Sequence, residues 1–267
     1  LADVIGAAQA VAAGDLSTRV QVRGPDDLRS LTDSFNRMAE TLERNDRERR
    51  DFLADIAHEL RTPLTVIQGK LEGIVDGVYL ADETHVAPVL EETYLLERLV
   101  DDLRLLTLAE TGQLHFDRRQ VDLGELAQQA ADLFAAEASE KGVAITVQAA
   151  SDLPAVSADP QRLSQVIGNL ISNALRYAPA GGRVTITARS VTGGAELTVS
   201  DNGPGVPEAD LPRLFDRFWR GEKSRSRAGG GAGLGLAIAR QLVEAQGGTI
   251  AASNVPGGGL RVAFILR

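Results

Sequence analysis

The spacing of apolar residues changes along the chain, and its first part reads as two short helices. In residues 1–46, apolar side chains recur every three or four positions in the stretches 1–11 and 28–42. The extended-looking sequence LSTRVQVRGPDD lies between them. This pattern predicts two amphipathic helices joined by a connector. Because two such short helices cannot bury their apolar stripes alone, it also predicts a dimer.

Residues 51–110 keep helical spacing over a greater length. Apolar side chains recur in this way on both sides of a turn expected near Leu80. We therefore expect an αα-hairpin, two copies of which would form a four-helix bundle. The charged run ERNDRERR at 43–50 predicts a solvated helical segment between the two apolar patterns.

From residue 116 onwards, strand-like runs alternate with helical ones. The strand-like runs are VAITVQA, RVTITARS, AELTVS, GTIAAS and LRVAFIL, and the helical runs are VDLGELAQQAADLFAAEASEKG, DPQRLSQVIGNLISNALRYA and GLAIARQLVEAQ. This alternation predicts an α+β domain with a mixed or largely antiparallel sheet covered by helices.

Composition narrows the classes of function. The 267 residues, 43% of them hydrophobic, are enough for two or three domains with real cores. The net charge of −9 disfavours direct binding of nucleic acid, which needs a basic face. The absence of cysteine excludes disulfides and thiolate metal sites. No run of about 18 apolar residues occurs, and the chain opens at Leu1 inside a helical pattern, so we interpret it as a soluble fragment of a longer protein.

The segment FLADIAHELRTPLT, residues 52–65, carries an unusual histidine. His58 lies about 200° around the helix from the apolar stripe, so it is expected to face water. The ordinary interpretation is a solvated bystander. Against this, Glu59 is placed to orient the ring, and Pro63 removes a backbone donor, which predicts a bend or loosening of the helix. The pattern indicates an imidazole that a mobile group can reach.

Two segments of the last domain carry candidate ligand-binding side chains. NLISNALRYAP places Asn169 and Asn173 on one helix face, where amide oxygens suit Mg²⁺. In DNGPGV, a buried Asp201 could accept a hydrogen bond from an exocyclic amine, and Gly203 and Gly205 would let a flat base approach the backbone. Local capping by the asparagines and an ordinary tight turn are the alternatives.

Two further segments are rich in glycine. RLFDRFWRGEKSRSRAGGGAGLGLAIARQ combines six basic residues with glycines that lead into a helix, an arrangement suited to polyphosphate. It lacks the lysine of a P-loop and the preceding strand of a dinucleotide-binding fold. A flexible linker is the alternative interpretation. GGT at 247–249 is by itself an ordinary helix stop.

In this order and spacing, the segments resemble those of the sensor histidine kinases of two-component signalling, over essentially the whole chain. AHELRTPL resembles the phosphoacceptor box, NLISNALRYAP the asparagine box, and DNGPGV, LFDRFWR and GGGAGLGLAI the boxes of the ATP-binding domain. AAGDLSTRV and DDLRSLTDSFNRMAETL resemble a HAMP relay domain. The resemblance implies three domains. They are an N-terminally truncated all-α HAMP domain at 1–46, a dimeric phosphotransfer hairpin forming a four-helix bundle at 47–113, and an α+β sandwich ATP-binding domain of the GHKL type at 114–267.

The resemblance also implies roles for individual residues. His58 would be phosphorylated by ATP, and Glu59 would orient or deprotonate it. Thr62 would help to position water when the kinase dephosphorylates its partner. Asn173, with Asn169 nearby, would hold Mg²⁺, and Asp201 would bind the adenine amine. The remaining nucleotide contacts would come from Arg176, Tyr177, Gly203, Gly205, Arg220, Gly233, Leu234, Gly235 and Leu236. Phe215 and Phe218 would anchor the lid formed by the glycine-rich segment.

The function implied is autophosphorylation of His58 in a homodimer and phosphotransfer to the receiver domain of a response regulator, with phosphatase activity towards it. An upstream transmembrane segment, absent from this fragment, would hold the full-length protein at the cytoplasmic side of the inner membrane. Two alternatives remain: a conformational ATPase with the same ATP fold, and a non-catalytic dimeric scaffold. The histidine box argues against the first and the intact nucleotide motifs against the second.

Overall fold

The structure is a computed structural model that describes residues 2–21, 26–221 and 232–267. The chain divides into two compact units, Leu1–Tyr79 and Leu80–Arg267. Within the three described ranges, no helix is both long enough and apolar enough to cross a membrane.

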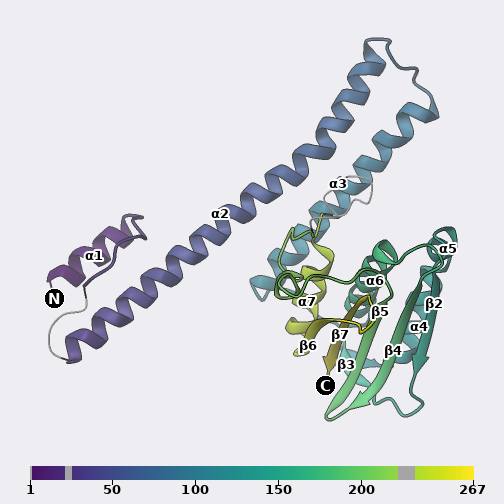
Figure 1. Ribbon diagram of the computed structural model, residues 1–267. Coiled ribbons are helices and arrows are strands. Elements are labelled where there is room, and N and C mark those ends of the chain that lie inside the picture. Colours follow the sequence, from purple (N-terminus) through teal and green to yellow (C-terminus); the bar gives the residue numbers. More distant parts are fainter. Residues whose placement is uncertain (1, 22–25, 222–231) are drawn as a thin grey trace. The chain divides into compact units, whose positions relative to one another are not determined.

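The first unit consists of two helices, α1 (Ala2–Ala12) and α2 (Asp26–Val75), which run in roughly the same direction (Figure 1). Ala7 of α1 packs with Phe35 and Ala39 of α2 in a small apolar cluster. The side-chain amide of Asn36 accepts a hydrogen bond from the Val20 backbone N–H at 2.9 Å and donates one to the Val20 carbonyl at 2.8 Å. These paired bonds hold the connector against α2.

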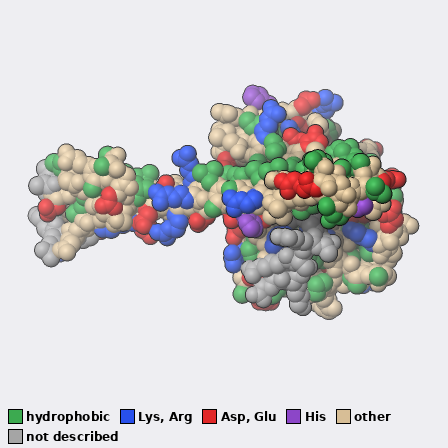
Figure 2. All heavy atoms as spheres, turned by 90° about the horizontal axis from the view of Figure 1, so that it is seen from above, with side chains coloured by type: hydrophobic (Ala, Val, Ile, Leu, Met, Phe, Trp, Pro, Cys, Tyr) green, Lys and Arg blue, Asp and Glu red, His purple; other side chains and the backbone are tan. Residues whose placement is uncertain are grey.

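Helix α2 is one continuous helix. It includes the second helix predicted in residues 1–46, the charged run at 43–50 and the first helix of the predicted hairpin. The charged residues 43–50 are helical and mostly exposed, and Figure 2 shows charged side chains of both signs gathered along this part of α2. Ion pairs at i, i+4 spacing support it: Arg47–Glu43 at 2.9 Å, Arg50–Asp46 at 2.7 Å and Arg44–Glu48 at 3.8 Å. The predicted solvated helical segment is confirmed. The expected boundary after residue 46 falls inside an unbroken helix.

Helix α2 also ends earlier than the apolar pattern indicated. It stops at Val75, and Val78 lies in the following turn. Gly77 has a left-handed backbone (φ 72°), and the N–H groups of Val78 and Tyr79 both donate to the Gly73 carbonyl at 2.9 Å. The chain reverses there because a left-handed glycine satisfies the last carbonyls of the helix.

The second unit begins with the long helix α3 (Glu83–Glu110). Asp82 caps its first turn by accepting a hydrogen bond from the His85 N–H at 3.2 Å. Leu99, Leu105 and Leu106 are buried. The described residues after α3 form a two-layer α+β domain, as the sequence predicted.

A five-stranded mixed sheet forms one layer of this domain, with the order β2-β4-β5-β7-β6. Only β2 and β4 of this sheet pair in parallel. Its strands are β2 (Ala144–Ala149), β4 (Arg183–Val191), β5 (Gly194–Asp201), β6 (Thr249–Asn254) and β7 (Leu260–Leu266). All five strand-like runs of the sequence therefore form strands. Two short strands that the sequence did not reveal, β1 (Arg119–Val121) and β3 (Val156–Ala158), pair with each other.

Helices α4 (Leu123–Leu133), α6 (Pro160–Tyr177) and α7 (Gly235–Ala245) form the other layer. Alternate residues of β4 (Val184, Ile186 and Ala188) are buried on the face toward them. The first helical run was expected to be one helix. It is instead broken at Phe134 into α4 and the short α5 (Ala135–Glu140).

Candidate functional site

The candidate phosphoacceptor, His58, is exposed on α2. Glu59 is half-buried and lies about 100° around the helix from it. The Thr62 hydroxyl donates a hydrogen bond to the His58 backbone carbonyl at 3.3 Å, which places this hydroxyl one turn along from the imidazole. The helix passes through the buried Pro63 without interruption, so the missing donor does not end it. The imidazole is open to solvent, as its position opposite the apolar stripe predicted.

Helix α6 positions the asparagines of the candidate nucleotide site. Asp159 caps it, with one carboxylate oxygen accepting from the N–H groups of Gln161 (2.9 Å) and Arg162 (3.1 Å). Pro160 occupies the first turn, where no N–H is needed. One face of α6 is buried, at Leu163, Val166, Ile167, Leu170, Ile171, Ala174 and Leu175. This burial leaves the asparagine face partly exposed.

Asn169 and Asn173 follow one another on that face, one turn apart. The Asn169 side-chain nitrogen donates to the Gly235 carbonyl at 3.0 Å, at the start of α7. Because the nitrogen is used, the Asn169 side-chain oxygen remains as a potential metal ligand. No cluster of three or more His, Cys, Asp or Glu suited to a metal occurs in the described ranges. Amide oxygens are hard ligands of the kind that Mg²⁺ accepts, with phosphate and water as its other ligands, so the two asparagines fit such an ion.

Asp201 ends β5 and is buried. One of its carboxylate oxygens accepts hydrogen bonds from the Gly203 N–H at 2.8 Å and the Leu260 N–H at 3.3 Å. Burial raises the pKa of Asp201 above its usual value, and these two backbone bonds oppose the rise. Two backbone donors thus hold the carboxylate in place, and a carboxylate in this position can accept a hydrogen bond from a ligand amine.

The turn after β5 lies against the C-terminal end of α6. A Cβ on Gly203 would come within 2.5 Å of the Tyr177 carbonyl oxygen. Gly205 has a left-handed backbone (φ 68°). The structure therefore brings Asp201 and Gly203 beside the backbone of Tyr177, and the side chains of Arg176 and Tyr177 are both exposed.

Two supports of this turn were missed by sequence reasoning. The Asn254 side chain accepts from the Val206 N–H at 2.9 Å and donates to the Val206 carbonyl at 2.7 Å. Gly259 has φ 108°, and a Cβ there would lie 2.0 Å from the Asp201 carbonyl oxygen. The run GGG at 257–259 was an available signal for the second support. Asn254 gave none, because its partner is 48 residues away.

The glycine-rich segment is described only at its two ends. Phe215, Phe218 and Arg220 precede the undescribed residues and are partly buried. Gly233 follows them with a left-handed backbone (φ 73°), and α7 begins at Gly235, followed by the half-buried Leu236. The expected basic residues Lys223, Arg225 and Arg227, and the glycines 229–231, lie outside the described residues.

Leu234 cannot contribute its side chain to a phosphate site, because that side chain is only 1% exposed. Any contact it makes with a phosphate would come from its backbone. Asn169, bonded to the Gly235 carbonyl, ties this end of the segment to the asparagine face of α6.

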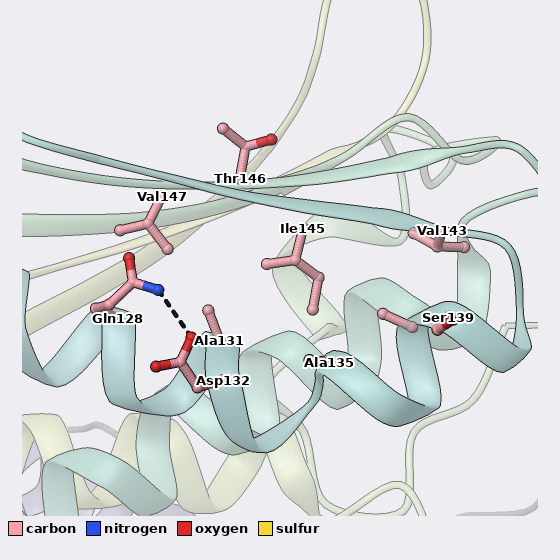
Figure 3. A pocket seen from close by; sticks show the side chains of 10 residues that line it. Gln128, Ala131, Asp132, Ala135, Ser139, Val143, Ile145, Thr146 and Val147 are labelled. Carbon is pink, nitrogen blue, oxygen red and sulfur yellow. Dashed lines mark hydrogen bonds between the residues drawn. The ribbon is translucent and has the colours of Figure 1, made fainter.

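A separate groove of about 570 Å³ lies between the edge strand β2 and helices α4 and α5 (Figure 3). Gln128 donates to Asp132 at 2.9 Å on its wall. None of the candidate site residues lines this groove. It therefore has no part in the arrangement around α6.

Comparison with protein families finds three matches along the chain. Residues 1–44 match the HAMP domain, and residues 48–112 match the His Kinase A (phospho-acceptor) domain. Residues 158–267 match the family described as histidine kinase-, DNA gyrase B-, and HSP90-like ATPase. His58 lies in the second match, and the residues around α6 lie in the third.

Individual proteins that are similar to the chain are also histidine kinases. The chain is 41% identical to the signal transduction histidine-protein kinase BaeS of Escherichia coli (strain K12), over 94% of this chain and 54% of BaeS. The solved structure of Acinetobacter baumannii histidine kinase AdeS matches with a TM-score of 0.67 and 32% identity, over 78% of this chain and 96% of that one. Histidine kinase ThkA in complex with response regulator protein TrrA matches with a TM-score of 0.66 and 25% identity, over 84% and 64%. The chain thus spans about half the length of the curated relative BaeS.

Proposed function

The chain belongs to the sensor histidine kinases, and from this premise we propose that it phosphorylates His58 with ATP and passes the phosphoryl group to an aspartate of a response regulator. The solved complex of ThkA with TrrA supports the kind of partner. The match of residues 158–267 to ATPases supports ATP as the phosphoryl donor.

The proposed domains are the HAMP relay at 1–46, the phosphotransfer hairpin at 47–113 and the ATP-binding domain at 114–267. The family matches support this order. Because α2 runs unbroken from Asp26 to Val75, the proposed boundary between the HAMP relay and the phosphotransfer hairpin lies within one helix. On the two sides of this boundary, the helix would pack against different neighbours. A rotation or tilt imposed at the HAMP end would be carried directly to His58.

The chemistry proposed at His58 is in-line phosphoryl transfer. A ring nitrogen lone pair forms the N–P bond while the bond from the γ-phosphorus to the ADP oxygen breaks. The proton on the other ring nitrogen passes to Glu59 or to water. Such a reaction needs positioning and charge neutralisation more than covalent help from the protein. An exposed imidazole suits this chemistry, since both ATP and a receiver domain must reach it.

The residues around α6 would hold the nucleotide. Asp201 would accept from the adenine amine, with Gly203, Gly205 and Tyr177 around the base. Bound Mg²⁺, held by Asn173 and Asn169, would neutralise phosphate charge. Arg176, Arg220 and the backbone of Gly233, Leu234, Gly235 and Leu236 would complete the phosphate contacts, assisted by the positive end of the α7 dipole.

The active form proposed is a homodimer. On α2, Leu53, Leu64 and Leu71 are 55%, 53% and 46% exposed, and on α3 Leu90 and Val100 are 50% and 55% exposed. Apolar side chains repeated at helical spacing and left open to water favour burial against a second copy.

We also propose phosphatase activity through Thr62, and attachment to the inner membrane through a segment preceding this chain.

The observation that carries the proposal is the exposed His58 on α2, with the Thr62 hydroxyl one turn along, inside the phospho-acceptor match. The test is incubation with Mg²⁺ and γ-labelled ATP, comparing the wild type with His58→Gln. His85→Gln and His115→Gln are matched controls, because these complete the three histidines of the chain. The label should be lost in acid, kept in alkali, and absent only from His58→Gln.

Label that persists in His58→Gln would reassign the acceptor. Nucleotide binding without any labelled histidine would favour a conformational ATPase. No nucleotide binding at all would favour a non-catalytic scaffold.

A further inference from the structure

Helices α6 and α7 pack against each other and are joined by hydrogen bonds at two places. In the candidate site, the Asn169 side-chain nitrogen donates to the Gly235 carbonyl. At the other end of α7, the side-chain oxygen of Gln246 accepts from the Asp159 backbone N–H at 2.7 Å. Asp159 precedes the first turn of α6, and Gln246 follows the last turn of α7. The two helices therefore run antiparallel, with one hydrogen bond at each end of α7.

The two hydrogen bonds are spaced alike along both helices. From Asp159 to Asn169, α6 advances ten residues, or about 15 Å. From Gly235 to Gln246, α7 advances eleven residues, or about 16.5 Å. Because a helix keeps its length, the place at which Gln246 is held determines where the Gly235 backbone lies.

The hydrogen bond between Asp159 and Gln246 is buried, and both side chains are fully used. The Gln246 side-chain nitrogen donates to the Leu242 carbonyl at 3.1 Å. One Asp159 carboxylate oxygen caps α6, and the other accepts from the Asp117 N–H at 3.0 Å. Removal of the Gln246 amide would leave the buried Asp159 N–H without its partner, which is costly.

The residues GGT at 247–249, which the sequence showed only as a helix stop, hold the same end of α7 on the sheet. Gly247 has a left-handed backbone (φ 86°). A Cβ on Gly248 would lie 2.5 Å from the Ile265 carbonyl oxygen of β7 and 2.9 Å from a methyl carbon of Val243 on α7. The C-terminal end of α7 is thus fixed against both the sheet and α6. Its N-terminal end carries the backbone proposed to contact phosphate.

We propose that Asp159 and Gln246 are positioning residues for phosphate binding, because their hydrogen bond sets the place of α7 along α6 and so the place of the backbone at 233–236. The inference rests on the proposed function, in which this backbone contacts phosphate. Apolar contacts between the helices are non-directional, whereas a hydrogen bond fixes distance and angle. The proposed adenine contact, Asp201, lies on β5 and does not depend on this bond.

The experiment therefore compares a ligand with phosphates and one without. Gln246→Met keeps the length of the side chain and removes its polar atoms. It should raise the Kd of a non-hydrolysable ATP analogue with Mg²⁺ roughly tenfold, the loss expected when a hydrogen bond to a charged group is misaligned. The Kd of adenosine should stay as in the wild type. Calorimetry measures the first ligand, and NMR titration measures the weaker second one.

Val243→Ala is the control for a merely structural role. Val243 is buried near the same end of α7, so its truncation lowers Tm without touching the hydrogen bond between Asp159 and Gln246. It should change neither Kd. Gln246→Asn, one methylene shorter, should act in the same direction as Gln246→Met and takes its place if that variant does not fold.

An unchanged Kd of the ATP analogue in the Gln246 variants overturns the inference while leaving the proposed function intact. A rise that adenosine or Val243→Ala shares equally also overturns it, because general destabilisation would then explain the effect. If the wild type does not bind the ATP analogue, the proposed function itself is wrong.

Discussion

The side-chain nitrogen of Asn169 donates a hydrogen bond to the backbone carbonyl of Gly235, 66 residues away, at 3.0 Å. This bond ties the helix that carries both asparagines to the first residue of α7. The asparagine motif of α6 and the glycine-rich motif before α7, which are separate in the sequence, therefore lie next to each other. Asn169 thus has a structural role in addition to its proposed one at the metal, whereas Asn173 lies one turn further along the same face.

The two asparagines should therefore respond differently to substitution. Asn173→Ala should lose the Mg²⁺-dependent part of ATP binding without a change in thermal stability. Asn169→Ala should weaken ATP binding and also lower the free energy of unfolding by about 1 kcal/mol, because a hydrogen bond is lost. Titrations with and without Mg²⁺, beside thermal unfolding, separate the effects. Ser164→Ala, exposed on α6, is the control; equal behaviour of both asparagine variants would contradict the prediction.

Thr62 can be tested against a close structural match. Thr62 and Thr65 both lie on α2, and each hydroxyl donates to the carbonyl four residues earlier, at 3.3 Å and 2.8 Å. Thr62→Ala should keep autophosphorylation and slow dephosphorylation of the receiver domain roughly tenfold, since a positioned water is lost. Thr65→Ala should change neither rate.

For both threonine variants, the rate of dephosphorylation of a phosphorylated receiver domain is measured. The receiver domain used is the one that the kinase phosphorylates fastest among a panel of receiver domains. Similar losses in both threonine variants would show that the helix, and not the Thr62 hydroxyl, is responsible.

Asp201 should show opposite effects on binding and stability. Burial raises its pKa in the folded state, so the stability it contributes is fully present below its ordinary pKa and is lost as pH rises through the folded value. Asp201→Asn should therefore raise Tm at pH 8 and have less effect at pH 4. It should weaken ATP binding about tenfold, because a charge-assisted hydrogen bond to the base is lost. A variant that loses both Tm and ATP binding at pH 8 would contradict this account.

Asp102 on α3 should make stability depend on pH near neutrality. Burial, and then the neighbouring charge of Asp101, raise the pKa of Asp102 to about 6, while Arg98 opposes the rise. The ionised form is thus disfavoured in the folded state, and stability is lost as pH rises through about 6 from the ordinary value of 3.8. Asp102→Asn should raise Tm at pH 8 and change it little at pH 4. Thermal unfolding across this range checks the sign, with Glu97→Gln as the control.

Much of the fold could be predicted because its signals are local. The five sheet strands, α6 and α7 follow from period-2 and helical spacing. The α4–α5 break at Phe134 could not be predicted, since the sequence there remains apolar and helix-favouring. Strands β1 and β3 span only three residues each, too few for a periodic signal, and they are stabilised by pairing with each other.

The order of motifs indicated the residues of the candidate site, because glycines, asparagines and an exposed histidine are recognisable by their local chemistry, and their contacts with ligands stay a prediction. The residues that hold these groups in place could not be predicted from the sequence. Asn254 holds Val206, Gly259 admits the Asp201 backbone, and Glu110 reaches Arg217, all across long stretches of sequence. Sequence by itself determined which groups the protein carries and which helix or strand bears each one. Tertiary structure decided which of them meet, because contacts between distant residues depend on how the sheet and helices pack.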